Sequence, residues 1–226
     1  MNLDKFKHKS FCDGRIVMIN ADCEAVIAEI GDKEIDLVLT DPPYGIDYGS
    51  QLIKGDYQQI SNKHGWKNYG NPEWDKERPK NQIFELMLRI AKNQIIWGGN
   101  YFADLLPAMQ CWLVWDKGQR EFSLADGEMA WTSFDKAMRI FTYARSKALQ
   151  DGKVHPTQKP VALMAWCLNN YSKENDLIFD AFAGSFTTAI ACIRTKRRFI
   201  GCELDETYFE KAVERVETEL KQGVLF

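Results

Sequence analysis

The sequence predicts an α/β fold, in which a mostly parallel sheet is covered by helices on both faces. The first observation is the order of the elements, because short apolar runs that predict strands alternate with segments of helical period. The second is size, since 226 residues of which 45% are hydrophobic suffice for a sizeable core. No internal repeat or obvious linker interrupts the chain, so we expect a single domain over residues 1–226.

The predicted strands are short apolar runs, and the predicted helices carry apolar residues at helical spacing. The strands lie at residues 15–20, 34–40, 93–99, 111–117, 128–134, 138–144, 175–184 (where the strand runs into a turn) and 198–204. The helices lie at residues 23–30, 79–92, 101–107, 159–171, 185–195 and 205–222. Pro79 suits the first turn of its helix. Residues 45–78 have no clear period and predict a long loop.

The composition predicts a cytoplasmic protein without a membrane partner. No apolar run reaches the roughly 18 residues of a membrane span, and the N-terminus lacks the apolar core of a secretory signal. The six cysteines form no CxxC pair, which favours reduced thiols over disulfides or a metal site. The net charge of −3 at pH 7 argues weakly against a nucleic-acid partner, but basic clusters such as residues 194–198 are compatible with one basic face.

The segment TDPPYG, at residues 40–45, predicts a binding turn for a base amine. Asp41 follows an apolar strand, and Pro42 and Pro43 have fixed φ angles and donate no backbone hydrogen bond. An amine donates hydrogen bonds and a flat base needs a ring for stacking. Asp41 and the carbonyl of Pro42 therefore suit the amine, and Tyr44 suits the base. The alternative is a plain strand-ending turn, since Asp and Pro are common in turns.

The segment DAFAGSFTT, at residues 180–188, predicts a nucleoside site. A strand ends at Asp180, a turn of small residues follows, and a helix begins near Ser185, which is where nucleotide-like ligands meet α/β sheets. About 20 residues later the next strand ends at Glu203, which is placed to bind a ribose hydroxyl pair. The phosphate-binding pattern GxGxxG and a P-loop lysine are absent, so we expect a nucleoside without a pyrophosphate. An ordinary strand-to-helix turn is the alternative.

The segment HPTQKP, at residues 155–160, places a cation and two hydrogen-bonding side chains before a helix. Lys159 suits an anionic group such as a carboxylate, and Thr157 and Gln158 suit hydrogen bonds to it. A polar approach to a helix that has Pro160 in its first turn is the alternative.

Together, TDPPYG, IIWGGNYF, HPTQKP and the pair FAGSFTT and GCELDETY resemble the DNA amino-methyltransferases of the permuted group, in which the catalytic DPPY precedes the cofactor turn. The resemblance extends from about Arg15 to Glu217. It implies the class I methyltransferase fold, a Rossmann-like sheet of seven mostly parallel strands of which one is antiparallel. It also implies S-adenosylmethionine as the cofactor, S-adenosylhomocysteine as its product, double-stranded DNA as the partner, and no metal.

The resemblance further assigns roles to individual residues. The catalytic turn Asp41, Pro42, Pro43 and Tyr44 would hold the flipped base and its amine. The positions that would contact the cofactor are Asp22, Cys23, Asp41, Thr157, Gln158, Lys159, Asp180, Phe182, Ala183, Gly184, Ser185, Thr187 and Glu203.

The chain departs from the pattern of that group in the cofactor turn. Where the group usually has DPF-x-GSGTT, this chain has Ala181 in place of the proline and Phe186 in place of the second glycine. A glycine there allows close approach to a ligand and positive φ angles. The ring of Phe186 either points away from the pocket or fills part of it, and these two outcomes predict an active enzyme and an impaired one.

We therefore expect a site-specific methyltransferase that modifies N6 of adenine in DNA. Three other functions remain open: methylation of N4 of cytosine, action on RNA or on a protein amide, and a catalytically impaired module that only binds DNA. A nicotinamide-dependent dehydrogenase is excluded by the missing GxGxxG. The absence of a cysteine nucleophile in a matching motif argues against methylation of C5 of cytosine.

Two segments are candidates for DNA recognition, residues 46–78 and residues 117–153. The first mixes aromatic and basic residues such as Tyr48, Lys54 and Trp66, a combination that suits nucleic acid. Neither segment is a long separate domain. We therefore expect either a short recognition sequence or a homodimer that completes recognition.

Overall fold

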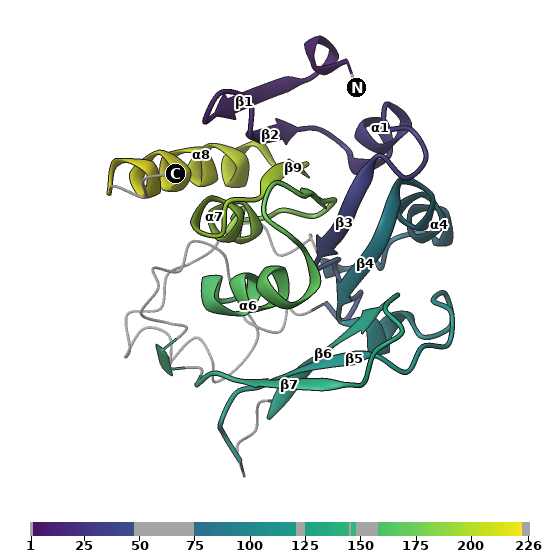
Figure 1. The fold of residues 1–226 in the computed structure, drawn as a ribbon. Coiled ribbons are helices and arrows are strands. Elements are labelled where there is room, and N and C mark those ends of the chain that lie inside the picture. The colour runs from purple at the N-terminus through teal and green to yellow at the C-terminus, as the bar shows by residue number, and fades with distance from the viewer. Residues whose placement is uncertain (1, 48–74, 121–124, 145, 148–157, 223–226) are drawn as a thin grey trace.

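The computed structural model describes residues 2–47, 75–120, 125–144, 146–147 and 158–222 (Figure 1). Its centre is one mixed sheet, with the strand order β1-β2-β9-β8-β3-β4-β6-β5-β7. The strands are β1 (Lys7–Phe11), β2 (Ile16–Asn20), β3 (Ile35–Thr40), β4 (Ala91–Trp97), β5 (Trp112–Asp116), β6 (Gly127–Thr132), β7 (Arg139–Thr142), β8 (Leu177–Asp180) and β9 (Arg198–Glu203).

The α/β class is as predicted, but the predicted count of seven strands is wrong, because the described residues form nine. The apolar runs predicted eight of these nine strands, and the strand without such a run is β1, which pairs antiparallel with β2 at the edge of the sheet. Its sequence KHKSF has no fully buried side chain, so it lacks the apolar pattern that reveals a strand. Pairing with β2 through the backbone holds it in place. As a result two strands, β1 and β6, run against the others, where one was expected.

Helices cover both faces of the sheet, as the alternating pattern predicted (Figure 1). One apolar core lies under α6 (Val161–Tyr171), α7 (Thr187–Arg194) and α8 (Glu206–Lys221). A second core lies under α1 (Cys23–Ala28), α4 (Asn81–Ile90) and the 3-10 helix η3 (Gly99–Phe102). Strand β3 serves both, since Leu37 and Leu39 face the first core and Val38 faces the second. A short 3-10 helix, η1 (Leu3–Lys5), precedes β1.

Most predicted elements are found within a few residues of their predicted bounds, but two differ in kind or extent. The predicted helix at 79–92 begins only at Asn81, after Lys80 as its N-cap, and Ala91 and Lys92 belong to β4 because they pair with β3. The predicted helix at 101–107 is the 3-10 helix η3, and it begins at Gly99.

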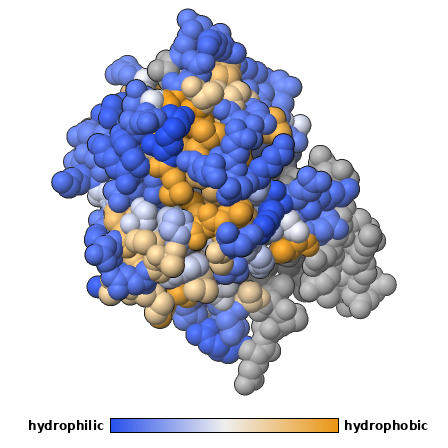
Figure 2. Space-filling view, turned by 90° about the vertical axis from the view of Figure 1, so that its right-hand side faces the viewer, coloured by the Kyte–Doolittle hydropathy of each residue, from blue (hydrophilic) through white to orange (hydrophobic). Residues whose placement is uncertain are grey.

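The two candidate DNA-recognition segments are described only in part. Residues 48–74 of the first segment lie outside the described residues. The described part of the second segment contains β6 and β7, which are strands of the main sheet. On the side of the molecule shown in Figure 2, hydrophobic residues gather in the middle and hydrophilic residues surround them. None of the described helices is long and apolar enough to cross a membrane.

Candidate active site

Three carboxylates lie at the carboxyl ends of neighbouring parallel strands. Asp41 follows β3, Asp180 ends β8 and Glu203 ends β9, and these strands are adjacent in the order β9-β8-β3. Ligands of open α/β sheets bind outside the carboxyl ends of the strands. A cavity of about 450 Å³ lies at this edge, a size typical of sites for small molecules.

The cavity brings together the turns that the sequence analysis singled out. The predicted cofactor positions that line it are Asp22, Cys23, Asp41, Gln158, Lys159, Asp180, Phe182, Ala183, Gly184, Ser185, Thr187 and Glu203. Thr157 lies outside the described residues, together with the two residues before it. Of the predicted catalytic turn, Asp41 and Pro43 line the cavity, whereas Pro42 and Tyr44 do not. The lining also includes residues with no predicted role: Ala21, Met164, Ala181, Thr188, Cys202, Leu204, Asp205 and Tyr208.

Asp180 lines the cavity and is held in place by two buried threonine hydroxyl groups. Thr40 and Thr188 each donate a hydrogen bond to its carboxylate at 2.7 Å, and the N–H of Phe182 donates one at 3.2 Å. Burial raises the pKa of Asp180 to about 6, even though these donors favour the ionised form. The carboxylate thereby joins the end of β3, the turn after β8 and the first turn of α7.

Glu203 accepts a backbone hydrogen bond on each carboxylate oxygen, from the N–H of Gly184 at 2.8 Å and from that of Asp205 at 2.9 Å. Burial raises its pKa to about 7. An ionised carboxylate has about four acceptor positions, so two remain for a ligand. The two backbone hydrogen bonds hold the carboxylate of Glu203 in one orientation, and the ribose contact stays a prediction.

The segment after β2 contributes Asp22 and Cys23 to the wall of the cavity. The carboxylate of Asp22 accepts a hydrogen bond of 2.7 Å from the N–H of Glu24 and caps helix α1. The neighbouring Cys23 is buried, and burial raises the pKa of its thiol to about 12. The thiol is therefore neutral at physiological pH and offers an apolar contact instead of a nucleophile.

Phe186 does not line the cavity. Its side chain is fully buried in the core beneath α7 and α8, where it meets Phe199 and Phe209 edge to face with ring centroids 6.0 and 6.1 Å away. The backbone at Phe186 keeps a left-handed φ of 53°, the conformation that a glycine adopts easily. Phe186 therefore takes the backbone conformation expected of the glycine in the family pattern, and its side chain packs into the core. The cavity stays open.

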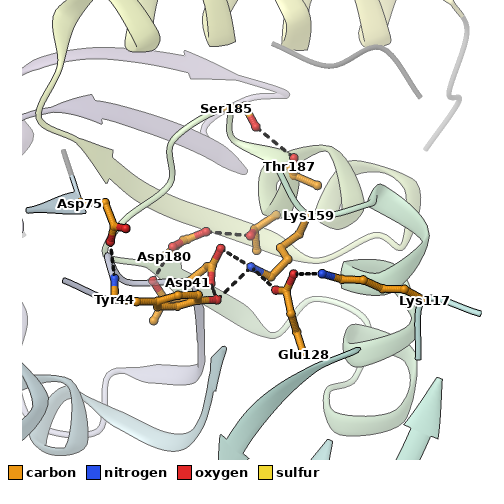
Figure 3. A network of polar contacts seen from close by, with 11 residues as sticks. Asp41, Tyr44, Asp75, Lys117, Glu128, Lys159, Asp180, Ser185 and Thr187 are labelled. Atoms are coloured by element: carbon orange, nitrogen blue, oxygen red, sulfur yellow. Dashed lines mark hydrogen bonds and ion pairs between the residues drawn. The ribbon is translucent and has the colours of Figure 1, made fainter. Parts of the chain in front are cut away.

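The catalytic turn presents a carboxylate whose two oxygens are both engaged. The hydroxyl of Tyr44 donates to Oδ1 of Asp41 at 2.6 Å, and the ammonium of Lys159 lies 2.5 Å from Oδ2 (Figure 3). Burial raises the pKa of Asp41, and Lys159 opposes this effect. Burial also raises the pKa of Tyr44 well above its usual range, so its hydroxyl stays protonated and donates.

The ring of Tyr44 is held from several sides. A Cβ added at Gly98, after β4, would lie 2.0 Å from Cε1 of Tyr44, so only a glycine lets the ring lie where it does. Tyr101 stacks on Tyr44 with ring centroids 4.6 Å apart and planes inclined by 14°. Asp75 accepts the N–H groups of Tyr44 and Gly45 at 2.7 and 3.0 Å.

Lys159 is almost fully buried and forms a second ion pair. Its Nζ lies 2.9 Å from Oε2 of Glu128 on β6, and the other carboxylate oxygen of Glu128 lies 2.6 Å from Nζ of Lys117 (Figure 3). Burial lowers the pKa of Lys159, but Asp41 and Glu128 outweigh it and hold the pKa above its usual value. Lys159 is therefore a permanent cation at the end of the cavity.

Several residues of this site carried no predicted role. Gly98 and Tyr101 lie in IIWGGNYF, where a glycine pair after a strand is itself a sign of close approach. Asp75 and Glu128 gave no local signal, because each acts on a residue about 30 positions away in the chain. Only the folded sheet brings them to the catalytic turn.

The arrangement places the carboxylates of Asp41, Asp180 and Glu203 along one cavity. Glu203 and Asp41 both line this cavity, and the cation Lys159 lies beside Asp41. Two cysteines line the cavity, Cys23 and Cys202, and burial raises the pKa of both thiols, which argues against covalent catalysis through a thiol.

The chain is similar to type II methyltransferases over most of its length. M2.DpnII of Streptococcus pneumoniae is 23% identical in an alignment of 248 positions, gaps included, that covers 91% of this chain and 91% of that protein. M2.LlaDCHI of Lactococcus lactis subsp. cremoris is 23% identical in an alignment of 238 positions, gaps included, that covers 88% of each chain.

Solved structures of DNA methyltransferases share the fold. The M1.HpyAVI–SAM complex matches with a TM-score of 0.57 and 22% identity, covering 89% of this chain and 98% of that chain. The cytosine-N4-specific PvuII DNA methyltransferase matches with a TM-score of 0.59 and 15% identity, covering 92% of each. The N6/N4 DNA methylase family model matches residues 71–214, which include the cofactor turn and Glu203. That match spans more than half of the sequence, and the chain therefore belongs to the N6/N4 DNA methylase family.

Proposed function

We propose that this chain transfers a methyl group from S-adenosylmethionine to the exocyclic N6 amine of adenine in double-stranded DNA. One observation carries the proposal beyond family membership. The carboxylate of Asp41 lies at the end of the cavity that Glu203 also lines, and the ring of Tyr44 lies beside it. An acceptor for an amine and a pocket for a nucleoside cofactor therefore meet at one place.

The residues around the cavity fit the proposed cofactor. Glu203 has acceptor positions for the two ribose hydroxyls, and the half-buried ring of Phe182 and the exposed side chain of Leu204 offer apolar contact to an adenine. Lys159 and Gln158 offer polar groups to the amino-acid part. When bound, S-adenosylmethionine supplies an electrophilic methyl group.

The chain's own residues then activate and align the amine. The exocyclic amine is a poor nucleophile because its lone pair delocalises into the ring. Hydrogen bonds from its two N–H groups to Asp41 and to the carbonyl of Pro42 favour a more tetrahedral nitrogen with a localised lone pair. Alignment of two held reactants accounts for much of the rate in such sites, about 7 kcal/mol or more where the geometry is good.

The base must leave the duplex to reach Asp41, which costs a few kcal/mol. Stacking on an aromatic ring offsets about 1–3 kcal/mol of that cost. The ring of Tyr101 already stacks on one face of the Tyr44 ring, with the two planes inclined by only 14°. That face of Tyr44 therefore accepts a planar group. Displacement of Tyr101, which is 39% exposed, is the movement that we expect when a base enters.

The N4 amine of cytosine is the second candidate, because it offers the same two N–H donors to Asp41 and Pro42. A cytosine-N4-specific enzyme also shares the fold. The DPPY sequence favours adenine in our proposal. A catalytically impaired chain finds no support in the cofactor turn, since the ring of Phe186 lies in the core.

The first test is a calorimetric titration with S-adenosylmethionine and S-adenosylhomocysteine. Unmethylated genomic DNA is then incubated with the protein and the cofactor, and its hydrolysed nucleosides are identified by mass spectrometry. N6-methyladenine is the expected product, and N4-methylcytosine would establish the second candidate. Absence of both, with the cofactor bound, would contradict the proposal.

The variant Asp41→Ala tests the role of the acceptor. We expect methyl transfer to fall on the order of 100- to 1,000-fold while the cofactor still binds, because Asp41 acts on the amine. Asp104→Ala is the matched control, since it removes a carboxylate that pairs with Arg78 on the surface. Near-normal methylation by Asp41→Ala would contradict the role of Asp41 in activating the amine.

A further inference from the structure

Four buried or half-buried charges alternate in sign behind the catalytic turn. Asp41 pairs with Lys159, Lys159 with Glu128, and Glu128 with Lys117 (Figure 3). They come from four separate places in the chain: the turn after β3, the segment before α6, strand β6 and the residue after β5. Glu128 does not line the cavity and belongs to none of the sequence motifs, so neither the cofactor pocket nor the amine contact accounts for it.

The position of Lys159 poses a problem for the reaction. Its ammonium lies 2.5 Å from Oδ2 of Asp41, and the hydroxyl of Tyr44 occupies Oδ1. A base amine that hydrogen-bonds to Asp41 must therefore share or displace one of these donors. The side chain of Lys159 is only 4% exposed, so a displaced ammonium would gain little from water. A buried charge left without a partner strongly destabilises the folded protein.

Glu128 is the charged group that offsets this cost, beside the hydroxyl of Tyr44, which accepts a hydrogen bond of 3.1 Å from Nζ of Lys159. Its Oε2 lies 2.9 Å from Nζ of Lys159, and Glu128 is not among the residues that line the cavity. When the contact between Lys159 and Asp41 weakens, the ammonium keeps a carboxylate partner. Lys117 holds the other oxygen of Glu128 at 2.6 Å. Burial raises the pKa of Glu128, but Lys159 and Lys117 outweigh it and bring the pKa to about 2, so Glu128 stays ionised.

Building on the proposed function, we propose that Glu128 is a positioning residue that retains Lys159 when the target amine binds Asp41. Lys117 in turn anchors Glu128. Glu128 thereby keeps Asp41 a strong hydrogen-bond acceptor, since it competes for the cation that would otherwise bind Asp41 alone. Neither Glu128 nor Lys117 contacts the cofactor cavity, so both act through Lys159.

The charges that face Asp41 move its pKa in known directions, so the effect of removing each charge can be measured. Lys159 lowers the pKa of Asp41 and Glu128 raises it, while the hydroxyl of Tyr44 donates to Asp41 and lowers it. Asp180 is the other nearby carboxylate, and the charge of Asp41 raises its pKa. Loss of the negative charge at Glu128 lowers the pKa of Asp41, and loss of the positive charge at Lys117 raises it through Glu128.

The experiment measures methyl transfer in a single turnover, with the full chain in excess over unmethylated DNA and with saturating S-adenosylmethionine, between pH 5 and 9. The carboxylates of Asp180 and Glu203, with pKa values of about 6 and about 7, also titrate in this range, so the readout is the displacement of each variant's acid limb from that of the wild type. In Glu128→Gln we expect the rate to fall about tenfold and the acid limb of the pH profile to move to lower pH. In Lys117→Gln the acid limb should move to higher pH. Glu128→Asp, which keeps the charge, should restore the position of the limb.

A purely structural role would lower activity without opposite shifts of the two profiles. Glu219→Gln is the matched control, because it breaks the ion pair of 2.6 Å with Arg194 near the end of α8, and it should leave the acid limb in place. If both variants retain the wild-type acid limb while the wild type is active, the inference is wrong and the proposed function stands. If the wild type transfers no methyl group, the proposed function and this inference both fall.

Discussion

Gly98 is the position at which an added side-chain carbon, as in Gly98→Ala, should strongly slow methyl transfer. An added Cβ would lie 2.0 Å from Cε1 of Tyr44 and 2.6 Å from Cδ1 and Cζ. Ordinary contact begins at 3.4 Å, so the ring would have to move by about 1.4 Å. The Tyr44–Asp41 hydrogen bond is 2.6 Å long and does not survive a displacement of that size.

The expected size of the effect follows from these contacts. A misplacement of about 1 Å in a catalytic site costs roughly 100-fold in rate, so Gly98→Ala should lower single-turnover methyl transfer about 100-fold. The φ of 69° at Gly98 adds about 1–2 kcal/mol of backbone strain, because L residues disfavour the left-handed conformation. The loss of stability is measured by urea denaturation, and the loss of rate by incorporation of labelled methyl groups into DNA.

Gly14→Ala separates the two effects. Gly14 also has a positive φ, of 81°, but no atom lies within 4 Å of an added Cβ. The turn between β1 and β2 that contains Gly14 lies outside the active site. This control should lose about 1–2 kcal/mol of stability and keep the wild-type rate per folded molecule. A Gly98→Ala protein with wild-type methyl transfer would refute the account of how Tyr44 is held.

Three further predictions concern the cofactor end and the base end of the site. Phe186→Ala should lose about 3–5 kcal/mol of unfolding free energy, because it empties a fully buried position, and calorimetric titration should give an unchanged cofactor affinity; a tighter complex would mean that the ring obstructs the pocket. Because burial raises the pKa of Glu203 to about 7, the affinity for S-adenosylmethionine should be constant above pH 7 and weaken by up to about tenfold per pH unit below it. Titrations of the wild type and of Glu203→Gln from pH 5.5 to 8.5 check this, and the same pH dependence in the variant would rule Glu203 out as the cause. Tyr101→Ala uncovers the face of Tyr44 and should bind DNA that carries an unpaired target base more tightly than the wild type, as measured by fluorescence anisotropy; equal affinities would mean that Tyr101 does not cover the stacking face for the base.

Most residues that line the cavity could be predicted because they lie in contiguous sequence motifs. The turns that contain Asp41, Asp180 and Glu203 each follow an apolar run, so the sequence alone places their carboxylates at strand ends. Parallel strands then bring those ends to one edge of the sheet. For this reason every predicted cofactor position within the described residues lines one cavity.

The strand count could not be obtained in the same way. Strand β1 is held by backbone pairing at the sheet edge and has no fully buried side chain, so its sequence contains no period of apolar residues. Local patterns report burial, and a strand that is not buried leaves no such pattern.

Tertiary structure alone decided two features of the active site. The sequence left open whether the ring of Phe186 enters the pocket, because a side chain's direction depends on the neighbours that pack around it, and here Phe199 and Phe209 receive it in the core. The partners of Lys159 were equally hidden, since Glu128 is 31 residues away in the chain and reaches it only through the pairing of β6 into the sheet. Residue type and spacing predicted which groups line the cavity, whereas long-range packing determined which charges face each other.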